Sequence, residues 1–355
     1  MPYRILAINP GSTSTKISVF EDEKVLFTET LRHTNEELSP YKQVADQFEF
    51  RKRTIISSLE KHNINLGSIS IIVGRGGLLR PVESGVYQVN ERMKEDLIHP
   101  KMGEHASNLG GLIASDLASV IGCMACIADP VVVDELEQVA RITGLPQIER
   151  VSIFHALNHK AIAKIYAREC KREYADLNLI VVHLGGGVSI GAHKNGRVID
   201  VNNALNGEGP FSPERAGSLP AAALAELCYS GQYTLGEVKK MITGEGGLVA
   251  HLGTNSFYEV SQRIEKGDKR AELLSEAFAY NVSKAIGAAA AVLSGKVDAI
   301  LLTGGIANNK SLMDQIASRV EFIASVKVYP GEDEMAALAM NGLAVLKGEE
   351  SPKLY

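Results

Sequence analysis

The chain has 355 residues, of which 45% are hydrophobic and 22% charged, and its net charge is −5. This length is enough for about two domains, and the composition is that of a folded globular protein rather than a disordered one. Because 37 Lys and Arg stand against 42 Asp and Glu, with no basic run, nucleic acid and anionic membrane surfaces are not expected partners.

Neither a membrane span nor a disulfide framework is expected. The longest apolar stretch, residues 285–293, is far shorter than the roughly 20 residues that cross a bilayer, and the opening residues lack the pattern of a signal peptide. Cys123 and Cys126 form a CxxC, but they lie in the apolar run VIGCMACIADP, which favours a buried strand over a redox or zinc site. The expected location is the cytoplasm.

The chain opens on RILAINPGSTSTKISVF, an apolar strand that stops at Asn9 in a loop of small residues before β structure resumes. Such a loop offers backbone N–H groups, hydroxyls and one cation, which is how proteins grip phosphate. Strands over 17–20 and 24–31, a polar helix over 41–62 and a strand in 68–77 are expected next. Helical spacing then covers 93–120, a strand is expected over 125–132, and a helix begins at about 157.

The opening pattern recurs about 174 residues later, near His183. Residues 177–204 again show an apolar strand, a loop of glycines, a strand, a turn and a strand. The turn contains Asn195-Gly196, a strong hairpin signal because both central residues of a type I′ turn need positive φ. This recurrence predicts an internal duplication.

A third glycine loop follows the expected helix over 271–293. The strand over 299–302 leads into Thr303-Gly304-Gly305, and a strand, a turn and an amphipathic helix close the chain. Three glycine loops after apolar strands indicate one nucleotide gripped by two similar domains. The chain lacks GxxxxGK[ST], and GGGVSIG lacks the spacing of a dinucleotide fingerprint, so P-loop and dinucleotide-binding folds are disfavoured.

These motifs resemble the acetokinase family, within the superfamily of acetate and sugar kinases, heat-shock chaperones and actin. The blocks that carry the resemblance are INPGSTSTK, VGRGG, IADP, IFHALNH, VVHLGGGVSI, LLTGGIANN and DEMAALA. The resemblance implies an α/β fold of two duplicated domains of the actin-like ATPase (ribonuclease H-like) type, with a nucleotide cleft between them. Residues 1–155 plus 333–355 form the expected acid-substrate domain, residues 156–332 form the nucleotide-binding domain, and a homodimer or higher homo-oligomer is implied.

The resemblance also implies site residues. Arg75 and His105 bind the substrate; Arg75, His155, Arg215 and Asp129 are catalytic. Phosphate and nucleotide contacts fall on Asn9, Ser12, Ser14, Lys16, His183, Gly185, Gly186, Gly187, Gly304, Gly305 and Ile306. The implied Mg²⁺ residues are Asn9, Asp129 and one of Glu332, Asp333 and Glu334, and His159 is expected to serve structure.

Elementary chemistry explains why such a site needs cations. A carboxylate nucleophile has a pKa near 4.3 and is already ionised at pH 7, so no general base is needed. The obstacle is the approach of an anion to a polyphosphate, which Mg²⁺, Arg75 and Arg215 would neutralise while His155 donates a hydrogen bond.

The expected reaction is reversible, direct in-line transfer of the γ-phosphoryl group of ATP to a short-chain carboxylic acid. Pro10, the three glycines after His183 and the short chain point to the branch of the family that acts on butyrate. Alternatives within the family act on acetate, propionate or branched-chain acids. Outside it, an actin-like ATPase that works as a conformational switch and a sugar kinase remain open; a sugar kinase would need an acidic general base.

Overall fold

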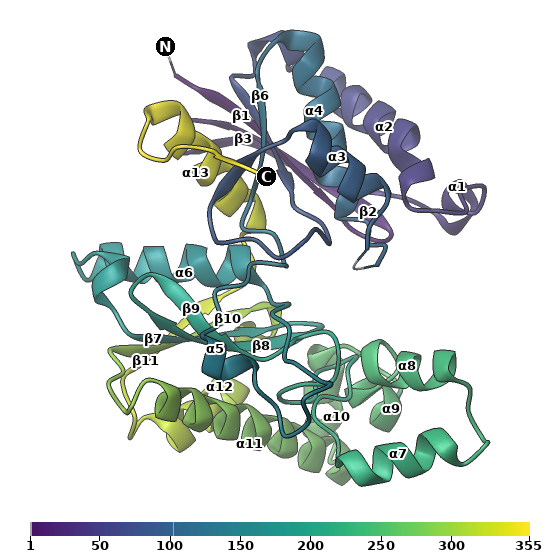
Figure 1. Cartoon of the computed structure of the whole chain (residues 1–355), viewed down its shortest axis with the longest axis vertical. Helices are drawn as coiled ribbons and strands as arrows, with labels where there is room; N and C mark the ends of the chain where they lie inside the picture. The colour runs from purple at the N-terminus through teal and green to yellow at the C-terminus, as the bar shows by residue number, and fades with distance from the viewer. Residues whose placement is uncertain (1, 102) are drawn as a thin grey trace. The chain divides into compact units, whose positions relative to one another are not determined.

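The structure, a computed structural model, describes residues 2–101 and 103–355. By its internal packing the chain divides into two compact units, unit 1 with residues Met1–Val133 and Asp333–Tyr355 and unit 2 with residues Asp134–Glu332 (Figure 1). Residues 134–155 thus pack with unit 2. The division into domains at residues 155 and 333 stays a prediction.

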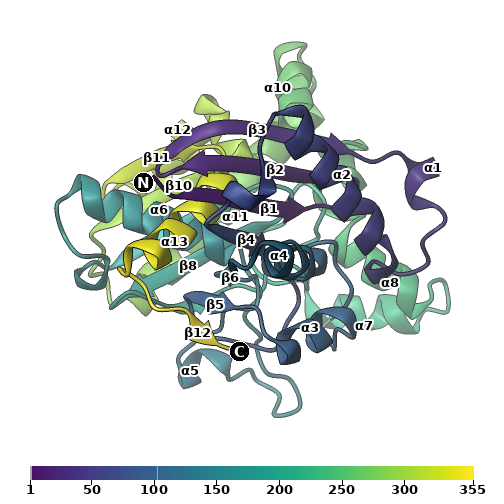
Figure 2. The ribbon, with the colours of Figure 1, turned by 90° about the horizontal axis from the view of Figure 1, so that it is seen from above.

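Unit 1 is built on a seven-stranded mixed sheet, in the order β12-β5-β6-β4-β1-β2-β3 (Figure 2). Its strands are β1 (Arg4–Pro10), β2 (Ser14–Glu21), β3 (Lys24–Arg32), β4 (Ile71–Arg75), β5 (Val86–Gln88), β6 (Met124–Ala128) and β12 (Lys353–Leu354). The central strands β1, β4 and β6 are parallel to one another. Their carboxyl ends therefore lie along one edge of the sheet.

Helices cover both faces of this sheet. They are α1 (Asn35–Leu38), α2 (Phe48–Lys61), α3 (Glu91–Ile98), α4 (Asn108–Ile121) and α13 (Glu334–Lys347), with 3-10 turns η1 (Ala45–Gln47) and η2 (Leu66–Ser68). Alternate side chains of β1 contact the helices on opposite faces of the sheet, because successive side chains of a strand point to opposite faces. Leu6 and Ile8 pack with α2 and α4, whereas Ile5 lies close to Gly342 of α13.

Unit 2 repeats the central part of this sheet with five strands in the order β11-β10-β7-β8-β9. They are β7 (Leu179–Leu184), β8 (Val188–Lys194), β9 (Arg197–Val201), β10 (Ala299–Gly304) and β11 (Val326–Pro330). The strands β7, β10 and β11 are parallel, and β8 and β9 continue antiparallel from β7. A β-bulge interrupts the β2/β3 pairing between Val19 and Phe20, and another interrupts β8/β9 between Ala192 and His193. The predicted duplication is confirmed.

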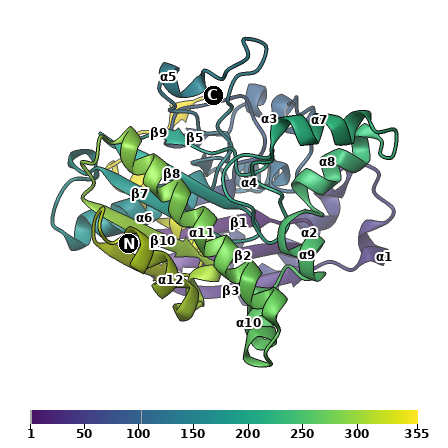
Figure 3. The same cartoon turned by 90° about the horizontal axis from the view of Figure 1, so that it is seen from below.

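Some helices of unit 2 form layers on its sheet, and others lie beyond it. All of them are α5 (Gln138–Arg141), α6 (Ala156–Glu169), α7 (Ala221–Tyr229), α8 (Leu235–Thr243), α9 (Gly247–Leu252), α10 (Phe257–Glu265), α11 (Lys269–Val292) and α12 (Lys310–Val320) among the described residues, with η3 (Tyr174–Asp176) and η4 (Gly305–Asn308). The long helix α11 lies beside α12 (Figure 3), and both pack on the face of the sheet that carries Ile180 and Val182. The opposite face, with Leu179 and Val181, packs against α6.

The predicted continuous helix over 93–120 is wrong: α3 ends at Ile98, and α4 begins at Asn108. Pro100 accounts for the break, because proline disfavours helical backbone in the residue before it.

Cys126 is fully buried in β6, and this burial raises the pKa of its thiol to about 12, as suits a packing residue. Among the described residues, no helix is long and apolar enough to cross a membrane.

Candidate active site

In unit 1, predicted site residues gather where the parallel strands end. Asn9 is the penultimate residue of β1, Arg75 is the last residue of β4, and Asp129 directly follows β6. In open α/β sheets, ligands bind beyond the carboxyl ends of the strands, especially where the direction of winding changes. The edge of the sheet that carries these three side chains is therefore the expected ligand-binding edge of unit 1.

Glu334 joins Asn9 and Arg75 from the first turn of α13. Its Oε1 lies 3.0 Å from Arg75 Nη2, and its Oε2 accepts hydrogen bonds from Arg75 Nη1 at 3.1 Å and from Asn9 Nδ2 at 2.5 Å. The carboxylate is thus held in a two-pronged ion pair, which fixes the direction of the guanidinium. The sequence alone did not separate Glu334 from Glu332 and Asp333; Asp333 instead caps α13, with its Oδ1 accepting from Ala336 N.

Asp129 is held in an unusual backbone conformation. Its φ is +38°, in a region that residues other than glycine rarely adopt. Its Oδ1 accepts hydrogen bonds from Ser84 Oγ at 2.7 Å and from Gly85 N at 2.8 Å. These two donors keep the carboxylate, which is almost wholly buried, in one orientation after the end of β6.

The first loop, which is predicted to bind phosphate, is organised by Arg51, a residue that was not predicted. Ser12 is exposed in this loop, Ser14 begins β2, and Lys16 lies half-buried two residues further on. The guanidinium of Arg51, fully buried on α2, donates to the loop carbonyls of Gly11, Ser12 and Ser14 and to Thr15 Oγ1 and Gln47 Oε1 at distances of 2.7–3.1 Å.

All of these partners of Arg51 are uncharged oxygens. Burial lowers the pKa of Arg51 to about 10, so the group is still a cation at pH 7. A buried positive charge therefore lies directly beneath the loop. No local sequence signal marks Arg51, because the stretch around it reads as an ordinary polar helix.

His105 also belongs to unit 1, in the turn before α4. Its Nδ1 lies 2.8 Å from Ser107 Oγ and accepts from Ser107 N at 3.2 Å. The turn places the imidazole close to the start of the helix. The described contacts do not join His105 to Arg75 or Asn9.

In unit 2, two histidines are stacked. The rings of His155, the N-cap residue of α6, and of His183, near the end of β7, have centroids 3.8 Å apart and planes 12° apart. His183 Nδ1 lies 2.8 Å from Asn158 Oδ1, and its Nε2 lies 3.2 Å from Glu332 Oε1. Glu332 thus belongs with His183, whereas Glu334 belongs with Arg75.

The second glycine loop is tightly packed at Gly187 and Gly185. A Cβ at Gly187 would lie 1.8 Å from Arg215 Nη1, and a Cβ at Gly185 would lie 2.9 Å from Glu332 Oε1. Gly186 adds a carbonyl that accepts from Ser212 Oγ. Glycine at position 187 is therefore what admits the guanidinium of Arg215 beside the loop.

Arg215 is the less satisfied of the two predicted catalytic arginines. Its Nη1 donates to the carbonyl of Ala204, while its buried Nε has no hydrogen-bond partner among the described residues. Burial lowers the pKa of Arg215, and the nearby Glu214 acts in the opposite direction. An unpartnered N–H on a buried cation costs free energy in the folded protein, which is typical of a group that serves a ligand.

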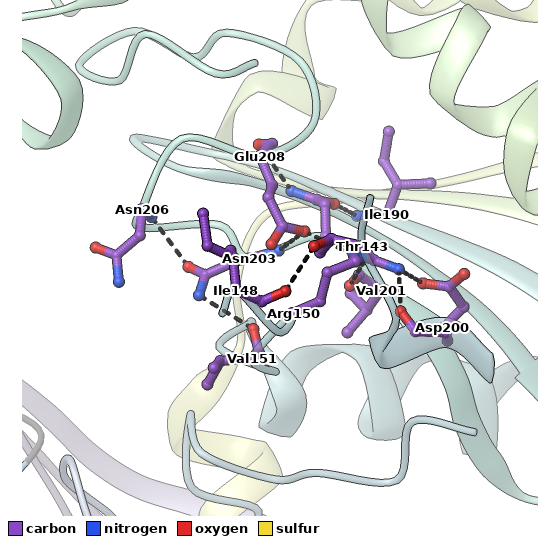
Figure 4. Close-up of polar contacts among 12 residues, drawn as sticks. Thr143, Ile148, Arg150, Val151, Ile190, Asp200, Val201, Asn203, Asn206 and Glu208 are labelled. Carbon is purple, nitrogen blue, oxygen red and sulfur yellow. Dashed lines mark hydrogen bonds and ion pairs between the residues drawn. The ribbon is translucent and has the colours of Figure 1, made fainter. Parts of the chain in front are cut away.

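A second arginine that was not predicted, Arg150, makes polar contacts with residues on both sides of Ala204 (Figure 4). Arg150 donates to Asp200 Oδ1 at 2.8 Å, to Glu208 Oε2 at 3.2 Å and to the carbonyl of Val201 at 2.9 Å. Burial alone would lower the pKa of Arg150, but Asp200 and Glu208 raise it. The cluster holds the turn that presents the carbonyl of Ala204.

The third glycine loop follows β10. Gly304 ends the strand with φ of +95°, and a Cβ there would lie 2.3 Å from the carbonyl oxygen of Leu184. Gly305 and Ile306 begin η4, and Gly305 N donates to Glu332 Oε1 at 3.4 Å. The loop after β10 is therefore packed directly against the end of β7.

The oxygen donors of unit 1 suit a hard cation. Mg²⁺ is commonly held by one or two carboxylates together with the phosphates of its substrate. Asp129 and Glu334 are carboxylates at the expected ligand-binding edge, and Asn9 adds an amide oxygen. Within residues 2–101 and 103–355, no group of three or more His, Cys, Asp or Glu side chains is arranged to hold a metal ion by itself.

The repeated sheet, the glycine loops and the cationic side chains define a kinase fold of the actin-like ATPase type. The pattern of the Acetokinase family matches residues 147–343. The chain is 58% identical to butyrate kinase 2 of Clostridium acetobutylicum over 355 residues, which is 100% of each chain. The chain belongs to the acetokinase family, as the motifs predicted.

Solved structures share the fold at low sequence identity. Acetate kinase of Porphyromonas gingivalis has a TM-score of 0.80 and 20% identity, over 97% of this chain and 100% of that one. A propionate kinase of Francisella tularensis has a TM-score of 0.73 and 19% identity, over 96% and 98%. The predicted fold class, duplicated α/β of the actin-like ATPase type, is confirmed.

Proposed function

We propose that this protein transfers the γ-phosphoryl group of ATP to the carboxylate of butyrate, giving butyryl phosphate and ADP in a reversible reaction. Two features support the proposal. The chain matches a butyrate kinase over its full length, and its fold carries a cation, Arg75 or Arg215, in each unit. The observation that carries the proposal is this pair of arginines, held by Glu334 in one unit and by Ala204 in the other.

In unit 1, the proposed work is to bind the acid and to screen its charge. A guanidinium carries five N–H donors, and Glu334 with Asn9 fixes its position while Arg75 binds the substrate carboxylate. His105 contributes to the same substrate. Asn9, Ser12, Ser14 and Lys16 hold phosphate oxygens on the loop that Arg51 supports.

In unit 2, the proposed role is to bind ATP and to stabilise the phosphoryl group during its transfer. Gly185, Gly186 and Gly187 with His183 grip the phosphates, and Gly304, Gly305 and Ile306 hold the nucleoside. Arg215 neutralises charge on the transferring group and His155 donates a hydrogen bond to it. Since the attacking carboxylate is already ionised, no residue is assigned as general base.

Asp129 and Glu334 are the proposed protein ligands of Mg²⁺, with Asn9 beside them. The bound ion would neutralise charge on the phosphates of ATP. Asp333 is not proposed as a ligand because it caps α13, and Glu332 is assigned to His183. Replacing Glu334 with Gln should therefore raise the Mg²⁺ concentration needed for half-maximal activity, whereas Asp333→Asn should not.

The substrate is tested by trapping acyl phosphate as hydroxamate with acetate, propionate, butyrate, isobutyrate and valerate side by side. We expect kcat/KM to be highest for butyrate or isobutyrate. One methylene contributes only about 1–3 kcal/mol of discrimination, so neighbouring acids should react more slowly rather than not at all. A maximum at acetate would keep the chemistry and change the substrate, and no hydroxamate with any acid would contradict the proposed function.

We further propose that the protein works in the cytoplasm as a homodimer or higher homo-oligomer. This part of the proposal rests on the family alone. Light scattering of the purified protein tests it, because a mass equal to one 38.2 kDa chain would contradict an oligomer.

A further inference from the structure

A chain of hydrogen bonds runs through the interior of unit 2 and ends on His155. Tyr174 Oη lies 2.7 Å from His193 Nδ1, and His193 Nε2 lies 3.2 Å from His159 Nδ1. His159 Nε2 lies 2.9 Å from Ser189 Oγ, which lies 2.8 Å from His155 Nδ1. We call Tyr174, His193, His159, Ser189 and His155 the histidine chain.

The spacing of residues along α6 and along β8 brings the members of the histidine chain together. His155 and His159 are one turn apart at the start of α6, so they lie on the same side of the helix. Ser189 and His193 are four residues apart in β8, so they lie on the same face of the strand. The two pairs alternate along the chain of hydrogen bonds, which is possible only where α6 packs against that face.

Gly191, midway between Ser189 and His193, makes room for the central hydrogen bond. A Cβ at this position would lie 3.1 Å from His159 Nδ1 and 3.2 Å from His193 Nε2. A side chain there would press on the two nitrogens that face each other. Glycine at position 191 therefore leaves the space in which the two imidazoles meet, and Val198, at 3.1 Å from such a Cβ, also lines that space.

The inner members of the histidine chain are uncharged. Ser189, His159 and His193 have no exposed surface. Burial, and then the charges of His183 and Lys160, holds the pKa of His159 well below its ordinary value, and burial, His159 and Lys160 do the same for His193. A neutral imidazole has one donor and one acceptor nitrogen. The tautomer of each ring therefore fixes the tautomer of the ring to which it is linked in the histidine chain.

Two arrangements of hydrogens complete the histidine chain. If Tyr174 donates to His193, then His193 and His159 carry their hydrogens on Nε2, Ser189 donates to His155 Nδ1, and His155 carries its hydrogen on Nε2. The reverse arrangement makes Tyr174 an acceptor and places the hydrogen of His155 on Nδ1. The first is favoured because a phenol is a good donor, with a pKa near 10, and a weaker acceptor than an imidazole nitrogen.

We propose that the histidine chain sets the tautomer of His155, keeping its hydrogen on Nε2 for donation to the transferring phosphoryl group. Ser189, His159, His193 and Tyr174 are then positioning residues. The proposal rests on the role assigned to His155 in the proposed function. Because the acid is already ionised, no proton has to travel: the histidine chain orients a donor and transfers nothing.

The most informative variant is Tyr174→Phe, because it removes only the hydroxyl at the far end of the histidine chain. The matched control is Tyr166→Phe, which removes a hydroxyl from a tyrosine on α6 that packs in the same core cluster. Two-bond ¹H–¹⁵N spectra of ¹⁵N-histidine protein, with His155 assigned from His155→Gln, report the tautomer directly. We expect an Nε2–H tautomer in the wild type, and ¹⁵N shifts of His155 that change in Tyr174→Phe but not in Tyr166→Phe.

Kinetics give a second readout that a packing role would not move. Loss of one hydrogen-bond donor to a transition state costs about 10²–10³-fold in kcat, so weaker orientation should cost part of this. We expect kcat to fall about tenfold in Ser189→Ala and less in Tyr174→Phe, with KM for ATP and butyrate unchanged. Ser18→Ala, which removes a fully buried hydroxyl from β2, is the control for burial alone.

The outcomes separate the inference from the proposed function. An Nδ1–H tautomer at His155 in the wild type, or identical His155 shifts in Tyr174→Phe and Tyr166→Phe, would overturn the inference. These spectra need no substrate. A wild type that makes no acyl phosphate would refute the proposed function alone, and the spectra would still decide whether the histidine chain sets the tautomer.

Discussion

The two units have the same central strands but differ in the buried polar groups next to their predicted phosphate loops. In unit 1, the buried guanidinium of Arg51 binds the first loop from beneath through its carbonyls. In unit 2, the strand that follows the second loop carries Ser189 and His193 of the uncharged histidine chain. Unit 1 thus has a buried permanent charge beneath its loop. Unit 2 has a series of neutral rings that includes residues of the strand after its loop, in addition to the guanidinium of Arg215 beside Gly187.

The two arrangements suit different tasks. A loop that meets anions gains from a cation that never loses its proton, since the field of a buried charge is weakly screened. A group that must donate one hydrogen in one direction gains from neutral neighbours that fix its tautomer. Variants that disturb each arrangement separately therefore test this comparison.

The largest effect is expected for the two arginines proposed to meet the reacting groups. Arginines in phosphoryl transfer are worth about 10³–10⁵ in rate. Arg75→Ala and Arg215→Ala should each lower kcat/KM at least about 10³-fold, while circular dichroism and the unfolding midpoint show that the fold survives.

Exposed ion-paired arginines provide controls in each unit. Arg80 pairs with Asp96 and Arg172 with Asp298, and such pairs are worth about 0–1 kcal/mol. Arg80→Ala and Arg172→Ala should keep nearly full activity. If Arg75→Ala or Arg215→Ala behaved like these controls, the corresponding role would be refuted.

Arg51→Met should cause the largest loss of stability. Hydrogen bonds to a charged group are worth about 1.5–3 kcal/mol each, and the loop carbonyls would be left without their donor, so the free energy of unfolding should fall by more than about 3 kcal/mol. Urea denaturation measures this. Arg53→Met, an exposed arginine on the same helix, should change stability by less than about 0.5 kcal/mol; equal losses in both variants would show that Arg51 does not support the loop.

His155→Ala should reduce kcat about 10²-fold, the usual loss for a single oxyanion donor, with little change in KM. His251, an exposed histidine of unit 2, is the control, and His251→Ala should remain fully active. A loss below about tenfold in His155→Ala would make His155 a packing residue. The histidine chain would then not end on a residue that contacts the phosphoryl group.

The smallest effect is on the pH dependence of stability. Burial, with the charge of Arg51, lowers the pKa of His33 in unit 1, and the pKa values of His159 and His193 are lowered in unit 2. The unfolded chain therefore binds these protons first as the pH falls below about 6.5, and stability is lost below that pH by about 1.4 kcal/mol per pH unit for each histidine.

Replacing single histidines shows how many protons the pH dependence of stability involves. The free energy of unfolding, measured from pH 7 to pH 5, should depend less steeply on pH in His33→Gln and in His193→Gln, by about one proton each. The glutamine amide keeps a polar group near the position of Nε2 without titrating. An unchanged slope would mean that the histidine is protonated in the folded protein.

Much of the fold could be predicted because the signals were local and repeated. The apolar strands that end near Asn9, near His183 and at Gly304 are each followed by loop residues in the sequence, so the pattern alone placed these loops at strand ends. The break between α3 and α4 was not predicted, because apolar residues recur at helical spacing on both sides of Pro100.

The supporting residues of the site could not be predicted, since their partners are distant in the sequence. Arg51 lies 37 residues from Ser14, and His193 lies 34 residues from His159. Nor could the sequence choose among Glu332, Asp333 and Glu334, which are neighbours in the chain yet bind a histidine, a helix end and an arginine. The start of α13 decides this, because each of its residues points in a different direction.

The most direct test of the account is the stereochemical course of one transfer. ATP made chiral at the γ-phosphorus with oxygen isotopes and sulfur is reacted with butyrate, and the configuration of the acyl thiophosphate is determined. Direct in-line transfer from ATP to the carboxylate predicts inversion. Retention would show that a side chain carries the phosphoryl group first and would contradict an active site that only positions, neutralises and orients.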